Sequence, residues 1–70
     1  MENSERKLDM LVKVHIPASG EWRYANMRMS LAANNKLVRI VDYDNTSTWV
    51  KDLTNGKMYM IYAQDLQKRE

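Results

Sequence analysis

The chain has 70 residues, a formal net charge of +2, 44% hydrophobic and 29% charged residues, and no cysteine. This is the size and composition of one small globular domain, whose core is too small to enclose a deep active site. The lack of cysteine excludes disulfide bonds and thiolate chemistry, and the single histidine, His15, excludes a histidine-rich zinc site.

The positive charge is concentrated at the two ends of the chain, in Arg6, Lys7, Lys68 and Arg69. Residues 8–66 carry seven basic and six acidic side chains, so they lack the basic stripe typical of a nucleic-acid-binding protein. No apolar signal-peptide segment and no run of roughly 18 apolar residues is present, so we expect no membrane contact and a cytoplasmic protein. We expect a single domain at 8–66, a flexible N-terminal arm at 1–7 and a C-terminal tail at 67–70.

The first predicted element is a half-buried strand from Leu8 to Ile16. Its apolar residues share one parity, at Met10, Val12, Val14 and Ile16. Pro17 ends the strand and begins a turn that runs to Gly20. His15 falls on the polar parity, with no nucleophile or orienting acid at a recognised spacing, so we expect a surface histidine without a catalytic role.

Residues 21–36 follow two patterns at once. One set of apolar side chains has helical spacing, namely Tyr24, Met27 and Leu31. Apolar and polar residues also alternate from Ala25 to Leu31, which favours an extended segment. The sequence therefore leaves two structures open here, an extended excursion or a helix at about 21–34 that Asn34 and Asn35 would end.

Three further strands are predicted in the second half, at Leu37–Tyr43, Thr48–Thr54 and Lys57–Ala63. Asn55-Gly56 lies between the last two and predicts a two-residue type I′ turn, with positive φ at both residues. Asp44–Ser47 predicts a four-residue turn. Asp42 and Asp44 have the spacing of a calcium loop, but Ser47 and Leu53 replace its glycine and glutamate, so we expect no metal site and no cofactor.

The two turns together predict a register for the three strands. Trp49 would face Tyr62, Arg39 would face Asp52, and Val50 would lie between Val41 and Ile61. The inner face would then carry seven apolar side chains: Val38, Ile40, Trp49, Leu53, Met58, Met60 and Tyr62. The outer face would carry the row Val41, Val50 and Ile61, beside a polar row of Arg39, Asp52 and Tyr59. We expect the apolar outer row to be covered by the excursion, a second copy of the chain or a partner.

A strand beginning at Trp49, a tight turn, the strand Lys57–Tyr62 and a single turn at Ala63–Leu66 resemble the last third of a Src-homology-3-like barrel. The resemblance implies an all-β, five-stranded small barrel closed by residues 8–16. A helix at about 21–34 would instead make the domain α+β. The Ala-Leu-Tyr-Asp-Tyr and Trp-Trp signatures of the peptide-binding members are missing, so recognition of proline-rich ligands is not implied.

No group of residues predicts catalysis or a small-molecule substrate, so we expect a non-catalytic protein-interaction module whose partner is another protein or a second copy of the chain. Its expected binding residues are Trp22, Tyr24, Arg28, Val41, Val50, Ile61, Arg39 and Tyr59. The alternative is a nucleic-acid-binding barrel that uses an aromatic and basic surface of Trp22, Arg23, Tyr24, Arg28 and Lys36. Five internal methionines indicate a core that is partly an adaptable interface: Met10, Met27, Met29, Met58 and Met60.

Overall fold

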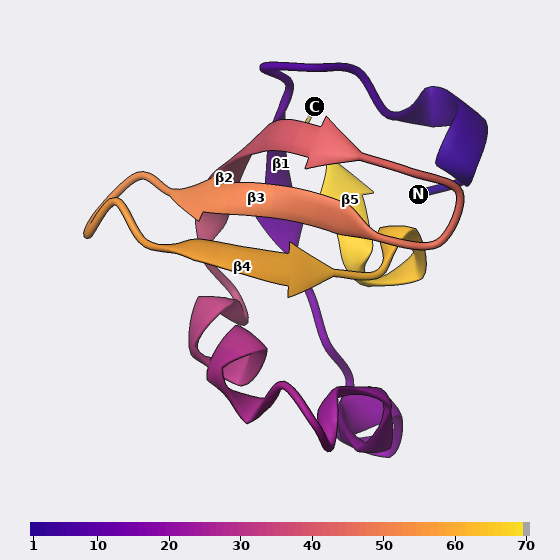
Figure 1. Ribbon diagram of the computed structural model, residues 1–70, viewed down its shortest axis with the longest axis vertical. Helices are drawn as coiled ribbons and strands as arrows, with labels where there is room; N and C mark the ends of the chain where they lie inside the picture. The colour runs from indigo at the N-terminus through magenta and orange to yellow at the C-terminus, as the bar shows by residue number, and fades with distance from the viewer. Residues whose placement is uncertain (70) are drawn as a thin grey trace.

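The computed structural model describes residues 1–69 and places five strands in one antiparallel sheet. The strands are β1 (Leu11–Val14), β2 (Leu37–Tyr43), β3 (Thr48–Asp52), β4 (Met58–Ile61) and β5 (Leu66–Lys68), in the order β4-β3-β2-β1-β5 (Figure 1). The sheet is open, so the expectation of a closed barrel is wrong. The chain leaves β4 through a short helical turn and pairs β5 with β1, which leaves β4 and β5 as the two edges.

Four short 3-10 helices join these strands: η1 (Asn3–Glu5), η2 (Ala18–Tyr24), η3 (Arg28–Ala33) and η4 (Ala63–Asp65). No helix within residues 1–69 has the length and apolar character that crossing a membrane requires. The excursion between β1 and β2 is therefore neither extended nor one α-helix. The chain breaks between η2 and η3, where Met27 has φ −143°, and η3 ends at Asn34, as predicted for a helix. The break folds the segment back, so that both Tyr24 and Ala33 reach the core.

The core lies between the two halves of the curved sheet. Figure 1 shows β1 and β5 behind β2, β3 and β4 and inclined to them, with the excursion below. The buried cluster contains Val12, Val14, Ile16, Tyr24, Ala33, Val38, Ile40, Val50, Tyr59, Ile61 and Leu66. Tyr24 from η2 and Ala33 from η3 close the open end of this space. The predicted alternation of the first strand is therefore confirmed, because Val12, Val14 and Ile16 are all buried.

A β-bulge in β2 decides which face of the sheet becomes the core. Tyr43 pairs with Thr48, as predicted, but the register shifts between Ile40 and Asp42, so Ile40 rather than Val41 pairs with Val50. One extra residue on one strand moves every side chain beyond it to the other face. Val38 and Ile40 thus join Val50 and Ile61 on a single apolar inner face, and the predicted division of the faces is wrong.

The β3–β4 loop is also longer than predicted. Trp49 pairs with Met60 rather than Tyr62, and the loop spans residues 53–56. The Asp52 N–H donates to the Lys57 carbonyl, and the Gly56 N–H donates to the Asp52 carbonyl, both at 2.8 Å. Of the two predicted turn residues, Gly56 has positive φ (73°) and Asn55 does not, so the type I′ turn is wrong at Asn55. The Asp52 carboxylate accepts the Thr54 N–H at 2.7 Å, and this local cap favours the longer loop.

Residues 1–7 contact the sheet chiefly through Arg6. Arg6 is buried and donates to the Ser47 carbonyl, the Thr48 hydroxyl and the Asp44 carbonyl, and its guanidinium lies 4.6 Å from the ring centroid of Tyr43. Arg6 thus binds the turn at Asp44–Ser47. This turn is confirmed, because the Asp44 carboxylate accepts the N–H groups of Thr46 and Ser47 at 2.9 Å. These contacts attach the N-terminal segment to the β2–β3 turn.

Candidate partner-binding groove

The fold buries half of the eight predicted partner-binding residues. Val50 and Ile61 are fully buried, Tyr59 is nearly so, and Val41 is half-buried. Val41, Val50 and Ile61 therefore do not form the predicted row on the outer face, because Val50 and Ile61 lie in the core. The polar row is not formed either, because Arg39 pairs with Lys51 across the strands and donates to the Asp9 carbonyl at 3.1 Å.

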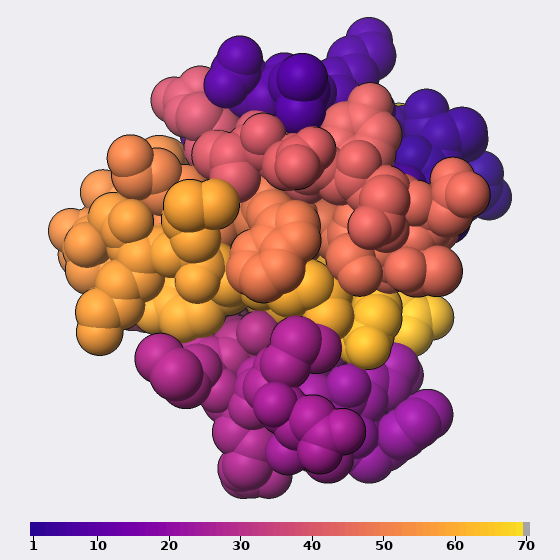
Figure 2. Space-filling model, in the orientation of Figure 1, coloured from indigo at the N-terminus to yellow at the C-terminus, as the bar shows by residue number. Residues whose placement is uncertain are grey.

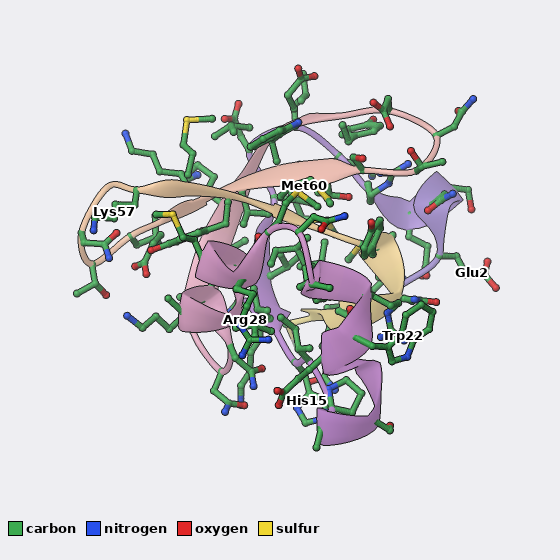
Figure 3. The ribbon with its side chains drawn as sticks, turned by 60° about the horizontal axis from the view of Figure 1, so that its bottom comes forward. Glu2, His15, Trp22, Arg28, Lys57 and Met60 are labelled. Carbon is green, nitrogen blue, oxygen red and sulfur yellow. The ribbon has the colours of Figure 1, made fainter. Side chains whose placement is uncertain are left out.

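The predicted nucleic-acid surface is likewise not assembled. Tyr24 is buried, and Arg23 and Lys36 are held by carboxylates, at 2.6 Å from Asp65 and 3.4 Å from Asp52 respectively. Trp22 and Arg28 are exposed, but they belong to η2 and η3 and lie apart in Figure 3. Of the five residues, the structure brings together Trp22 and Arg23, whose guanidinium lies 5.9 Å from the centroid of the Trp22 ring. Tyr24 is buried, so the predicted surface has one exposed aromatic side chain.

An apolar groove instead lies on the outer face, where the excursion meets β3 and β4. It has a volume of about 360 Å³ and is lined by Asn26, Met27, Arg28, Met29, Ser30, Trp49, Met58, Tyr59 and Met60. Figure 2 shows the magenta excursion and the orange strands meeting along this boundary on the visible face. Met29 is 74% exposed and Met58 54% exposed, so large apolar side chains remain in solvent at the groove.

The local backbone explains why these side chains converge. Trp49 pairs with Met60, and Lys51 pairs with Met58, so all four point to the outer face of the sheet. Met27 and Met29 flank the start of η3, which packs against β4. Trp49 and these four methionines were not selected individually as binding residues from the sequence. The sequence feature that points to the four methionines is the excess of methionine, because thioethers are favoured on surfaces that adapt to a partner.

The charge beside the groove is positive. Arg28 lines it, and Lys51 lies opposite Met58 on the same face of the sheet. Within residues 1–69, the ion pairs are Arg23–Asp65, Lys36–Asp52 and Lys68–Glu5, so neither Arg28 nor Lys51 has an acidic partner there. Among the residues that the structure describes, no acidic side chain lines the groove. Asp42, opposite Trp49, is the nearest acidic position in the strand register.

Two hydroxyl groups of the excursion form hydrogen bonds with backbone groups at the C-terminal end of the β4 edge. The Ser30 hydroxyl donates to the Met60 carbonyl at 2.8 Å, and the Tyr62 N–H donates to the Tyr24 hydroxyl at 3.0 Å. Met60 and Tyr62 belong to the parity that faces away from β3. An unpaired strand edge is a template for another strand, and side chains that occupy its backbone groups block that pairing.

The Tyr24 hydroxyl is also the centre of a buried polar network. It donates to Asp65 Oδ2 at 2.6 Å, and the guanidinium of Arg23 donates to Asp65 Oδ1 at 2.6 Å. Burial of the ring and then the bond to Asp65 raise the pKa of Tyr24. A Cβ at Gly20 would overlap this guanidinium, with Cζ at 2.8 Å, so the glycine makes room for the ion pair. The network holds η2 against η4.

The described residues do not form a cluster of metal-binding side chains. No group of three or more histidine, aspartate or glutamate side chains within 1–69 could hold a metal ion. His15 is exposed, as expected, and is labelled in Figure 3. A second hollow of about 480 Å³ lies between the N-terminal residues and the segment around Tyr62, and it is lined mainly by polar side chains such as Asn3, Asn45 and Gln64.

Comparison with known proteins adds no relative to this geometry: no protein-family model, no curated protein and no solved structure matches the chain.

Proposed function

We propose that the chain is a non-catalytic protein-interaction module that docks on a partner through the groove lined by Trp49 and the four methionines. The observation that carries the proposal is the exposure of large apolar side chains beside η3, on the face opposite a complete core. Apolar side chains that gather on one exposed surface, rather than lie scattered, are typical of contact sites. The order of the strands, with a long excursion after β1 and a 3-10 turn before β5, supports a Src-homology-3-like layout in an open form.

The test compares two substitutions that each place a lysine at an exposed apolar position. Met58→Lys changes the groove, whereas Leu8→Lys changes a residue that is 60% exposed and lies outside it. Tagged wild-type protein and both variants are used to capture partners from the native host, with and without nuclease. We expect proteins that resist nuclease treatment, bind the wild type and Leu8→Lys equally, and are lost from Met58→Lys.

The proposal fails if capture depends on nucleic acid or if both variants retain the same proteins. The first result would favour the alternative function, a nucleic-acid-binding domain, whose phosphate contacts make the affinity fall steeply with salt. The second would remove the groove as the contact surface. Both variants must first show the thermal unfolding midpoint of the wild type, so that a loss of capture is not a loss of fold.

A further inference from the structure

We infer that the groove takes an amphipathic, acidic helix of the partner, rather than an added β-strand or a nucleic acid. This inference rests on the proposed function and adds the chemistry of what binds. Three features on the same face support it: the shape and lining of the groove, the charge around it and the covered edge of β4.

The lining of the groove selects apolar side chains. Met27, Met29, Met58 and Met60 offer flexible, polarizable thioethers, and Trp49 offers one large ring. Such a surface adjusts to inserted leucine- or phenylalanine-like side chains of several shapes. Successive nucleobases need a platform of several exposed aromatic rings beside a basic track. Of the two aromatic residues that line the groove, Trp49 is 42% exposed and Tyr59 is buried.

The charge beside the groove selects an acidic partner. Arg28 and Lys51 are exposed and have no acidic partner within residues 1–69, and Lys51 lies opposite Met58 in the strand register. Carboxylates that flank the inserted apolar residues would pair with these two cations. Asp42 lies at the Trp49 end, so the acidic residues of the partner should be placed toward Met58.

The occupied backbone groups at the edge of β4 favour a helical ligand over an added β-strand. Addition of a strand requires free backbone groups along the edge, but Ser30 occupies the Met60 carbonyl and the Tyr24 hydroxyl occupies the Tyr62 N–H. A helix satisfies its own backbone hydrogen bonds and is recognised by side chains at i, i+3, i+4 and i+7. The occupant that needs none of these covered groups is therefore an amphipathic helix.

The experiment is a selection from a displayed library of random peptides of about 16 residues, a length at which short helices become marginally stable. The folded full-length protein is immobilised, and the net charge and apolar spacing of the enriched peptides are measured. We expect net acidic peptides with apolar residues at helical spacing. Synthetic copies should lose roughly tenfold or more in affinity on Met58→Lys, a central contact. They should lose roughly fivefold on Arg28→Glu, a charge at the rim.

Two controls make the charge and the site explicit. A second selection on the double variant Arg28→Glu with Lys51→Glu should enrich basic peptides. In a Trp22→Phe background, Trp49 is the single tryptophan, so a fluorescence change on titration of an enriched peptide places the ligand at the groove. Leu8→Lys should leave every affinity unchanged.

Several results would overturn the inference. These are enrichment of neutral, basic or extended peptides, failure to enrich any peptide, or binding that Met58→Lys leaves intact. Tighter binding of a labelled oligothymidylate than of any peptide would also overturn it, as would a concentration-dependent dimer that Met58→Lys abolishes. If the selection fails while capture of host proteins still depends on Met58, the proposed function stands and only the helical, acidic occupant is wrong.

Discussion

The two faces of the β3–β4 hairpin have nearly the same apolar content, but they differ in how deeply their side chains are buried. The inner face places Val50 and Ile61 in the core with no exposed surface, whereas the outer face leaves Trp49 42% exposed and Met58 54% exposed. β-branched side chains fill the inner face and thioethers gather on the outer one. The difference shows that this domain has stiff β-branched side chains where packing must be unique, whereas its exposed apolar side chains on the hairpin include a flexible thioether. The proposed partner-binding function rests on this second face.

The largest effect is expected from a lysine on the inner face. Val50→Lys places an ammonium group in the core with no acidic partner, and this costs more than the roughly 5 kcal/mol of stability typical of a marginal domain. We expect an unfolded protein by circular dichroism. Met58→Lys on the outer face should change the free energy of unfolding by no more than about 0.5 kcal/mol. A folded Val50→Lys would show that the inner face is not the core.

The second prediction concerns Tyr24, the residue of the excursion that closes the inner face. Tyr24→Phe keeps the ring but leaves Asp65 Oδ2 and the Tyr62 N–H without their partner, so we expect a loss of about 1–3 kcal/mol in urea unfolding. The raised pKa of Tyr24 means that the fold favours the neutral phenol. Its contribution is complete below about pH 10 and is lost as the pH rises further. This alkaline loss should be weaker in Tyr24→Phe, and an identical alkaline profile would contradict the role of the hydroxyl.

The third prediction concerns the loop that joins β3 to β4. Gly56 has φ 73°, a conformation that costs a residue with a Cβ about 1–2 kcal/mol. Gly56→Ala should therefore lower the free energy of unfolding by about that amount. Space is not the cause, because the nearest atom to such a Cβ is the Lys51 Cε at 3.9 Å. Asn55→Ala is the matched control and should lose less, since Asn55 has negative φ and contributes a bond to the exposed Lys57 N–H. Equal losses would indicate that Asn55 shares the left-handed conformation.

The smallest change in stability at neutral pH is expected from a substitution of Asp52, which lies at the end of the inner face. The Thr54 N–H and then the Lys36 ammonium hold the pKa of this carboxyl below its usual range, against the effect of burial. A lowered pKa gives stability that is present above the unfolded value of about 3.9 and is lost as the pH falls through the folded value. Asp52→Asn keeps an acceptor for Thr54, so it should flatten the acid limb of stability below about pH 4. A variant with the same acid limb as the wild type would contradict this.

Much of the local structure was predictable from the residues alone. The bounds of β2 at Leu37–Tyr43 are those predicted, and the turn at Asp44–Ser47 and the single turn after β4 are also confirmed. Each depends on neighbouring residues, such as a β-branched run or a side chain that caps its own turn. The methionine excess predicted an adaptable interface, which stays a prediction; the structure places four of the methionines at one groove.

The identity of the two faces was decided only by the tertiary structure. β2 carries apolar residues on both parities, at Val38, Ile40 and Val41, so its pattern allows either face to be buried. The bulge between Ile40 and Asp42 aligns Val38 and Ile40 with Val50, and this alignment is favourable because Tyr24 and Ala33 cover the resulting apolar face. Side chains alternate with period two, so a shift of one residue exchanges inside for outside. Packing against a distant segment selects between these registers, and local sequence does not contain that contact.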